Sequence, residues 1–301
     1  MNKAIPAFSR IGLIGRTGSH AVVESLKTVL NFLQRRHCEV FVEEETAASF
    51  FSATAPANNV KIIKKLALAE ECDLVIVVGG DGSMLGAARV LCKANIPVLG
   101  INRGSLGFLT DISPDEIETR VSEVLEGKFI REERFLLDVT VIRNGKDISQ
   151  ADAMNEVVVH RGTSLRMIEF ALYIDGQFVY SQHSDGLIVS TPTGSTAYSL
   201  SGGGPILHPG LDAIALVPMF SHALTSRPIV VEGNSKIKIV MGNFRGGQPE
   251  VSCDGQNHLS IEAADIIHIH KKNVTLSLIH PINYNYYETC RTKLGWGSRL
   301  S

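Results

Sequence analysis

The chain has 301 residues, of which 20% are charged, and its formal net charge of −2 gives no sign of a surface for nucleic acid or for an anionic membrane. This length allows a large core and suggests about two domains. No segment approaches the roughly 20 apolar residues of a membrane span, and residues 1–10 lack the apolar stretch of a signal peptide. The five cysteines are scattered without the close pairs of a metal site, which indicates reduced thiols. We therefore expect a cytoplasmic protein that binds small molecules.

The N-terminal part of the chain, residues 1–133, is predicted to be an α/β domain. Strands are expected at residues 10–15, 38–44, 73–78 and 96–101. Apolar residues at helical spacing predict a helix that carries Val22 to Leu33, and another that carries Ile117 to Leu125. Alternating strands and helices form a doubly wound parallel sheet, and ligands bind such sheets at the carboxyl ends of the strands.

The third of these strands ends in the loop Gly79-Gly80-Asp81-Gly82, ahead of a helix expected at Ser83–Arg89. Glycines in such a loop let backbone N–H groups and the positive end of the helix approach phosphate oxygens. The loop lacks the spacing of the dinucleotide fingerprint and the Gly-Lys of the nucleotide-hydrolase phosphate loop. A carboxylate that faces bound phosphate holds a metal ion or takes the proton from an attacking hydroxyl. The alternative is that Asp81 only caps the helix.

Residues 134–280 show an apolar pattern that is largely of period two, which predicts an all-β domain. Its strands are expected at residues 135–142, 155–160, 167–174, 186–191, 235–242, 265–270 and 274–279. Asp175-Gly176 is a two-residue hairpin signal. The last stretch, residues 281–301, is rich in aromatic side chains and is expected to dock back onto one of the two domains.

Two polar clusters in the β part are difficult to explain by packing. Residues 191–206 combine Ser and Thr hydroxyls with Tyr198 and four glycines, which favours hydrogen bonding to a polar ligand over a flexible linker. Asn155-Glu156 opens a strand, where a glutamate can accept both hydroxyls of a ribose and an amide can reach an adenine edge. The alternative for this pair is a solvated strand end, and for Asp185 a turn residue.

Taken together, these motifs resemble the NAD kinase family. They lie at residues 79–89, 101–111, 155–156, 184–206 and 252–256. The Gly-Gly-Asp-Gly motif alone also occurs in phosphofructokinases and in diacylglycerol and sphingosine kinases, whereas the block at 191–205 together with Asn155-Glu156 is far more specific. The resemblance implies an N-terminal α/β domain, a sandwich-like C-terminal β domain, and a homo-oligomer, either a dimer or a tetramer.

The resemblance also implies a reaction and roles for individual residues. Asp81 would be the general base when the terminal phosphoryl group of ATP is transferred to the 2′-hydroxyl of the adenosine ribose of NAD, giving NADP. Gly82 would lie against the dinucleotide, and Asn155 and Glu156 would bind its ribose and adenine region. The other positions that match contacts to NAD are Arg166, His183, Asp185, Thr196, Ala197, Tyr198, Ser199, Leu200, Ser201 and Gln256. Arginine commonly stands at the position of His183 in bacterial members, which leaves the choice between NAD and NADH open.

The glycine loop contains no lysine, so we expect a divalent cation, Mg²⁺, and backbone N–H groups to neutralise the transferred phosphoryl group. We assign no protein ligands to a metal, because His268 and His270 lack a third ligand nearby and fit one face of a strand. Arg103 fits a phosphate ligand or a loop anchor. The residues alone are also compatible with two other functions. One is a sugar or lipid kinase with the same glycine turn, and the other is a regulator that binds NADP or NADPH without catalysis.

Overall fold

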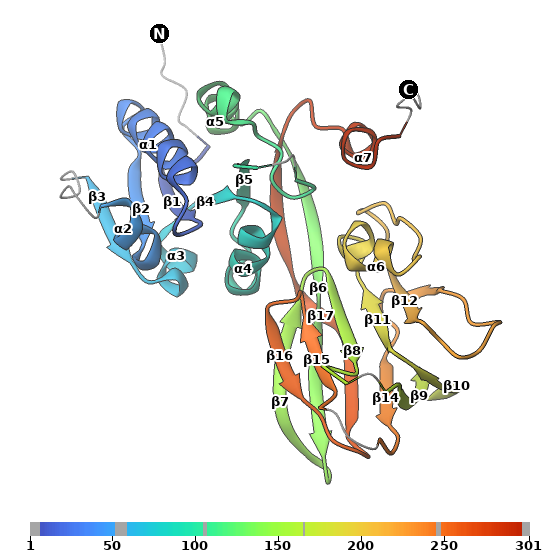
Figure 1. The fold of residues 1–301 in the computed structure, drawn as a ribbon. Coiled ribbons are helices and arrows are strands. Elements are labelled where there is room, and N and C mark those ends of the chain that lie inside the picture. Colours follow the sequence, from blue (N-terminus) through green and yellow to red (C-terminus); the bar gives the residue numbers. More distant parts are fainter. Residues whose placement is uncertain (1–6, 52–58, 105–106, 165, 245–247, 297–301) are drawn as a thin grey trace. The chain divides into compact units, whose positions relative to one another are not determined.

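The computed structural model describes residues 7–51, 59–104, 107–164, 166–244 and 248–296. The chain folds as two compact units, the first formed by Met1–Glu133 with Leu276–Ser301 and the second by Arg134–Thr275. The sequence pattern places the second boundary after residue 280, whereas in the structure the chain from Leu276 onward belongs to the first unit. The reason is that β17 (Ile266–Pro281) is one unbroken strand that begins in the second unit and ends in the first (Figure 1).

The first unit is built on a parallel sheet with the strand order β5-β4-β1-β2-β3. The strands are β1 (Arg10–Gly15), β2 (Glu39–Glu43), β3 (Val60–Ile63), β4 (Leu74–Gly79) and β5 (Val98–Asn102). The end of β17 continues this sheet, because Leu278 pairs with Val98 of β5 in parallel register. The predicted parallel α/β sheet is therefore confirmed.

Helices cover the strands of this sheet and bury its central residues. They are α1 (His20–Arg35), α2 (Glu44–Phe50), α3 (Lys65–Glu71), α4 (Asp81–Leu91), α5 (Ile117–Leu125) and α7 (Tyr286–Leu294). Helix α1 packs beside α5, and α3 packs beside α4 (Figure 1). The five residues from Leu74 to Val78 are fully buried, which explains the unbroken run of apolar side chains in β4. This strand delivers the glycine loop and Asp81 to its carboxyl end.

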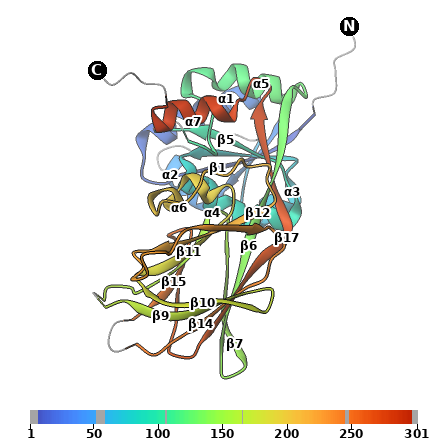
Figure 2. The ribbon, with the colours of Figure 1, turned by 90° about the vertical axis from the view of Figure 1, so that its right-hand side faces the viewer.

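The second unit contains two antiparallel sheets (Figure 2). One has the order β13-β12-β11-β8-β15-β16, and the other has the order β10-β9-β14-β17, with the antiparallel pair β6 and β7 joined to β17 through β6. The strands are β6 (Phe129–Arg143), β7 (Lys146–Ala153), β8 (Glu156–His160), β9 (Ile168–Ile174), β10 (Gln177–Ser184), β11 (Gly186–Ser190), β12 (Ala213–Met219), β13 (Ile229–Glu232), β14 (Ile237–Met241), β15 (Glu250–Cys253) and β16 (Asn257–Ser260). One apolar cluster draws side chains from both sheets, which is the arrangement of a sandwich.

Two local features follow from the sequence of this unit. Asp175 and Gly176 have φ angles of +51° and +79° and join β9 to β10, as the hairpin signal predicts. In β8, Val157 and Val159 point into the apolar cluster, so Glu156, Val158 and His160 lie on the opposite face. This alternation places polar side chains on the face of the sheet that carries the candidate site.

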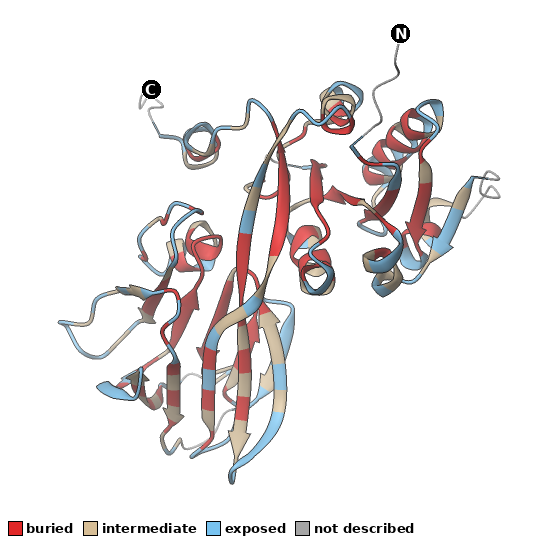
Figure 3. Cartoon of the chain, turned by 180° about the vertical axis from the view of Figure 1, so that it is seen from behind, coloured by how far each residue is buried: buried red, intermediate tan, exposed pale blue. Residues whose placement is uncertain are grey.

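Figure 3 shows the buried positions concentrated along the strands. All five cysteines belong to the described residues, and each is a buried free thiol. Burial raises the pKa of the Cys72 thiol to about 12. Among the described residues, no helix combines the length and the apolar character needed to cross a membrane.

Candidate functional site

Asp81 is the first residue of α4, directly after the loop that ends β4. Its carboxylate accepts hydrogen bonds from the main-chain N–H groups of Phe108 at 2.9 Å and Leu109 at 3.0 Å, and from the Thr110 hydroxyl at 3.3 Å. A Cβ on Gly107 would lie 2.1 Å from the Asp81 Oδ1 atom, so this close approach requires glycine. The segment Gly107–Thr110 therefore fixes the direction of the carboxylate. Two neighbouring residues of the sequence motif, Ser105 and Leu106, lie outside the described residues.

A cavity of about 250 Å³ opens beside Asp81 in the first unit. Its lining includes Arg16, Arg103 and Lys293, together with Asn102 and the glycines of the loop. Arg103 is also paired with Glu24 at 3.4 Å, and its side chain is only 17% exposed. Three cationic side chains thus surround one carboxylate, and we call this space the cationic cavity. Such a charge pattern suits a ligand with several negative charges.

The C-terminal helix α7 contacts the segment that holds Asp81. The rings of Tyr286 and Phe108 lie 6.3 Å apart, and the Lys293 ammonium lies 5.8 Å from the centre of the Phe108 ring. Asn285 caps the helix by accepting hydrogen bonds from the N–H groups of Tyr287 and Glu288. The aromatic residues of the C-terminal stretch therefore bring a lysine to the cationic cavity.

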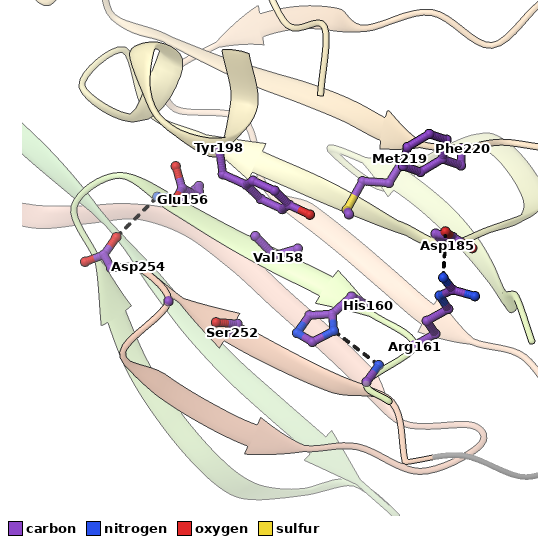
Figure 4. Close-up of a pocket in the computed structure, with 12 residues that line it drawn as sticks. Glu156, Val158, His160, Arg161, Asp185, Tyr198, Met219, Phe220, Ser252 and Asp254 are labelled. Atoms are coloured by element: carbon purple, nitrogen blue, oxygen red, sulfur yellow. Dashed lines mark hydrogen bonds and ion pairs between the residues drawn. The ribbon is translucent and has the colours of Figure 1, made fainter. Parts of the chain in front are cut away.

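A larger pocket of about 430 Å³ lies within the second unit (Figure 4). Its lining combines the outward-facing residues of β8 with residues of β12 and β15 and of the segments next to β8, β11, β12 and β15. The residues that line it are Glu156, Val158, His160, Arg161, Gly162, Asp185, Tyr198, Met219, Phe220, Ser252, Asp254 and Gly255. We call this space the dinucleotide pocket, after the ligand that the sequence predicts for Glu156, Asp185 and Tyr198.

Two carboxylates lie side by side in the dinucleotide pocket, and their surroundings differ. Asp254 accepts hydrogen bonds from the N–H groups of Met154 at 3.0 Å, Asn155 at 2.8 Å and Glu156 at 3.3 Å. Burial, with the charge of Asp254, raises the pKa of Glu156 to about 8, although a hydrogen bond from the Tyr198 main chain acts the other way. At neutral pH the Glu156 carboxyl is therefore protonated, and it offers a ligand both a donor and an acceptor.

The Ser- and Thr-rich loop contacts the segment that carries Asn155 and Glu156. Some of its hydroxyl groups form hydrogen bonds within the protein. The Thr191 hydroxyl donates to the Met154 carbonyl at 2.6 Å, and the Ser195 hydroxyl donates to the Pro192 carbonyl at 2.6 Å. Thr191 and Ser195 are not among the dinucleotide contacts expected from the sequence; both are buried, and their hydrogen bonds hold the loop in place. A Cβ on Gly194 would lie 2.1 Å from the Asn155 carbonyl oxygen, which explains a glycine in this loop.

Three of the expected dinucleotide contacts therefore come together in one pocket: Glu156, Asp185 and Tyr198. Asp185 pairs there with Arg161 at 3.2 Å, and Tyr198, which is 46% exposed, projects over the pocket from the short helix α6 (Tyr198–Ser201) (Figure 4). Gly82 lies beside Asp81 in the first unit. The other expected contacts belong to the second unit but are not among the described lining of this pocket: Asn155, Arg166, His183, Thr196, Ala197, Ser199, Leu200, Ser201 and Gln256.

Five residues of this pocket were not predicted from the sequence: Asp254, His160, Arg161, Met219 and Phe220. For Asp254 a signal existed, because it lies inside the motif at residues 252–256. For His160 the signal was the alternation of β8, which places every second side chain on the face of Glu156. Met219 ends β12, a strand that we did not predict, and Phe220 directly follows it.

His160, Glu250 and His258 form a cluster on three neighbouring strands, with ligand atoms all within 4.8 Å of one another. The Glu250 carboxylate lies 3.3 Å from His160 Nε2 and 3.4 Å from His258 Nδ1. The Gly162 N–H donates to His160 Nδ1 at 3.1 Å, so a neutral His160 ring carries its proton on Nε2, toward Glu250. In this tautomer the Nε2 atom carries a proton that can be donated to Glu250, and it has no free lone pair for a metal ion. Burial lowers the pKa of His160, which keeps the ring neutral.

Comparisons with known proteins identify the family of the chain. Residues 11–129 match the family model of the ATP-NAD kinase N-terminal domain, and residues 154–280 match that of the ATP-NAD kinase C-terminal domain. An NAD kinase of Azotobacter vinelandii is 59% identical over 97% of this chain and 98% of its own length, and one of Ectopseudomonas mendocina is 58% identical over the same shares.

Two solved structures share the fold. A yeast NADH kinase in complex with NADH has a TM-score of 0.87 at 24% identity, covering 98% of this chain and 90% of its own. An NAD kinase from Archaeoglobus fulgidus in complex with ATP has a TM-score of 0.68 at 25% identity, covering 95% of this chain and 97% of its own. The matches extend over both units of the chain.

Proposed function

Because this chain belongs to the NAD kinase family, we propose that it phosphorylates NAD to NADP with Asp81 as the general base. The terminal phosphoryl group of ATP is transferred to the 2′-hydroxyl of the adenosine ribose. The observation that carries the assignment of the base is the position of Asp81: it follows a buried strand, borders the cationic cavity, and is held by two amides and a hydroxyl. Among the described residues that line this cavity, Asp81 is the one carboxylate.

In the reaction, the ribose oxygen attacks the terminal phosphorus, and the bond from that phosphorus to the bridging oxygen of ADP breaks. The proton of the hydroxyl moves to Asp81, which increases the nucleophilicity of the attacking oxygen. General base catalysis contributes typically about 10²- to 10⁴-fold, so positioning and electrostatic stabilisation must supply the rest. The N–H groups of Phe108 and Leu109 keep the carboxylate in one orientation during this step.

The cationic cavity is our candidate site for the phosphates of ATP. Arg16, Arg103 and Lys293 bring positive charge to its lining. Among the described residues, nothing beyond the adjoining chain lies within 4 Å of where a Cβ on Gly80 would be. Phosphate oxygens can therefore approach the glycine loop and the start of α4. Arginine and lysine at this site supply the charge that the loop itself lacks.

We also propose that Mg²⁺ accompanies ATP. The Asn102 side chain lines the cavity beside Asp81, and its amide oxygen is a hard ligand of the kind that Mg²⁺ accepts. A bound Mg²⁺ would neutralise charge on the phosphates of the donor. The small number of protein oxygens fits an ion that arrives mainly through phosphate oxygens and water.

For NAD, we propose that the dinucleotide pocket binds part of the dinucleotide through Glu156, Asp185 and Tyr198. The remaining expected contacts are part of the same proposal: Gly82, Asn155, Arg166, His183, Thr196, Ala197, Ser199, Leu200, Ser201 and Gln256. His183 is exposed and lies 3.8 Å from Glu169, so an imidazole in place of arginine leaves this edge less positively charged. We therefore expect phosphorylation of NADH as well as NAD.

We further propose a homo-oligomer that works in the cytoplasm. The side chains of Phe220 and Leu224 are 80% and 92% exposed, which is unusual for large apolar residues and fits a surface that another subunit covers. The five free thiols fit a reducing compartment. Light scattering of the purified protein measures its mass, and a monomer at micromolar concentration would contradict the oligomer.

The function is tested with purified protein, ATP, Mg²⁺ and NAD, with NADP as the measured product. We expect NADP to form only when all three are present. A regulator would bind the dinucleotide without forming NADP, and a sugar or lipid kinase would consume ATP only with its own acceptor. A parallel assay with NADH tests the role of His183, and the absence of NADPH would remove that part of the proposal.

A further inference from the structure

His280 lies close to the end of β17 and is completely buried in the first unit. Its Nδ1 atom is 2.9 Å from Asp111 Oδ2, and its Nε2 atom is 3.6 Å from Glu132 Oε2. The ring stacks on Tyr284, with centroids 3.9 Å apart and an angle of 11° between the planes. A buried imidazole between two carboxylates is an uncommon arrangement, and nothing in the proposed reaction yet uses it.

The two carboxylates decide the protonation state of this ring. Each ring nitrogen faces one of them, and only a doubly protonated imidazole presents an N–H group on both sides. Burial alone would lower the pKa of His280, but the hydrogen bond to Asp111, the nearby Glu132 carboxylate and the charges of both groups raise it above the ordinary value. A neutral ring would leave one N–H group for two carboxylates, so the charged ring is the form that holds both in place.

Asp111 directly follows the segment that holds Asp81. Within this segment the Gly107 N–H donates to the Thr110 carbonyl at 3.2 Å, and Phe108 and Leu109 donate to Asp81. Next to Asp111, the Ile112 carbonyl accepts a hydrogen bond from the Asn102 N–H at 2.8 Å, at the end of β5. The segment is therefore attached to β5 through its main chain and to β17 through the side chains of Asp111 and His280.

We propose that His280 is a positioning residue for Asp81: by holding Asp111, it fixes the segment whose N–H groups orient the Asp81 carboxylate. The proposal rests on the proposed function, because it matters for catalysis only if Asp81 is the base. His280 itself touches neither Asp81 nor the cationic cavity among the contacts of the described residues. Its effect is expected on turnover rather than on binding of NAD.

The first test compares His280→Gln with His270→Gln, a change of an exposed histidine on the same strand. We expect His280→Gln to lower kcat about tenfold while KM for NAD stays within about twofold, because misplacing the base affects the transition state more than binding. Hydrogen exchange in peptides that contain residues 107–112 should become faster in His280→Gln and should not change in His270→Gln. An unchanged kcat, or unchanged exchange, would overturn the proposal.

A double-mutant cycle separates positioning from a merely structural role. In a background of Asp81→Asn, the His280→Gln change should cost no further turnover, because the group that it positions is already lost. An equal loss in both backgrounds would show that His280 acts independently of Asp81 and would overturn the proposal. If Asp81→Asn alone keeps the kcat of the wild type, the assignment of the base fails instead. Asp111→Asn, which keeps the shape of the side chain, provides the same cycle should His280→Gln not fold.

Discussion

The Asp254 carboxylate holds the main chain from which Glu156 projects, accepting the Glu156 N–H at 3.3 Å, while its charge disfavours ionisation of the Glu156 side chain. Three N–H groups stabilise the charged form of Asp254. The Glu156 side chain is buried, and its Oε2 atom has no hydrogen-bond partner among the described residues. Two neighbouring acids thus have different protonation states, so one stabilises the fold and the other is available to a ligand.

The raised pKa of Glu156 predicts a change of stability with pH. Folded Glu156 keeps its proton up to about pH 8, whereas the unfolded chain releases it near pH 4.3, so stability falls as pH rises between these values. The variant Glu156→Gln has no ionisable group at this position, so it does not show this fall of stability with pH. The difference in the free energy of unfolding between the variant and the wild type should therefore grow from pH 5 to pH 8, by at most about 1.4 kcal/mol per pH unit.

Urea unfolding at several pH values measures this difference, and Glu232→Gln, at an exposed position, serves as control. A difference that does not depend on pH would contradict the neutral state of Glu156. The same variant should bind NAD at pH 7 with an affinity close to that of the wild type, because an amide, like a protonated carboxyl, is both donor and acceptor.

Removing the Asp254 carboxylate should destabilise the protein and weaken binding of NAD. Asp254→Ala leaves the N–H groups of Met154, Asn155 and Glu156 without their acceptor in a buried place. We expect the free energy of unfolding to fall by about 3 kcal/mol, since each unsatisfied buried donor costs roughly 1–3 kcal/mol and water relieves part of this. Urea unfolding measures the loss, and a change below about 0.5 kcal/mol, the size seen at ordinary surface positions, would contradict it.

A side chain at Gly107 should impair turnover more than loss of the Thr110 hydroxyl. Gly107→Ala places a Cβ where the Asp81 Oδ1 atom lies, so the carboxylate or the segment must move. Thr110→Val removes only the hydrogen bond of 3.3 Å and leaves the two N–H donors. Steady-state kinetics should show a loss in kcat of about 10²-fold for Gly107→Ala and of less than about tenfold for Thr110→Val. The reverse order would show that the segment does not orient Asp81.

The parts of the fold that the sequence predicted well are those with strong local patterns. The unbroken apolar run of β4 reflects burial on two faces, and the alternation in β9 and β14 reflects the packing of one face against the core; both patterns are visible in the sequence. Among the strands that were missed, β3 and β7 have side chains that are largely exposed or polar and show no clear alternation. Tertiary pairing at the edge of a sheet decides such strands, and local propensity does not reveal it.

The site was predicted less completely than the fold. The sequence indicated Asp81, Glu156 and Tyr198, since glycines, acids and hydroxyls after strands are informative. It did not reveal that Asp81 is held by a segment 27 residues away, because hydrogen bonds from main-chain N–H groups do not depend on which side chains the donors carry. The sequence also does not reveal that the Thr191 hydroxyl donates to the Met154 carbonyl, because every residue carries such an acceptor.

The central claim, that Asp81 is the general base, is tested most directly by turnover and NAD affinity in Asp81→Asn, with Asp115→Asn at an exposed position as control. We predict that kcat falls by about 10²- to 10⁴-fold while the Kd for NAD, measured by calorimetry, changes by less than about twofold. The control should match the wild type in both. Wild-type turnover in Asp81→Asn would contradict the assignment.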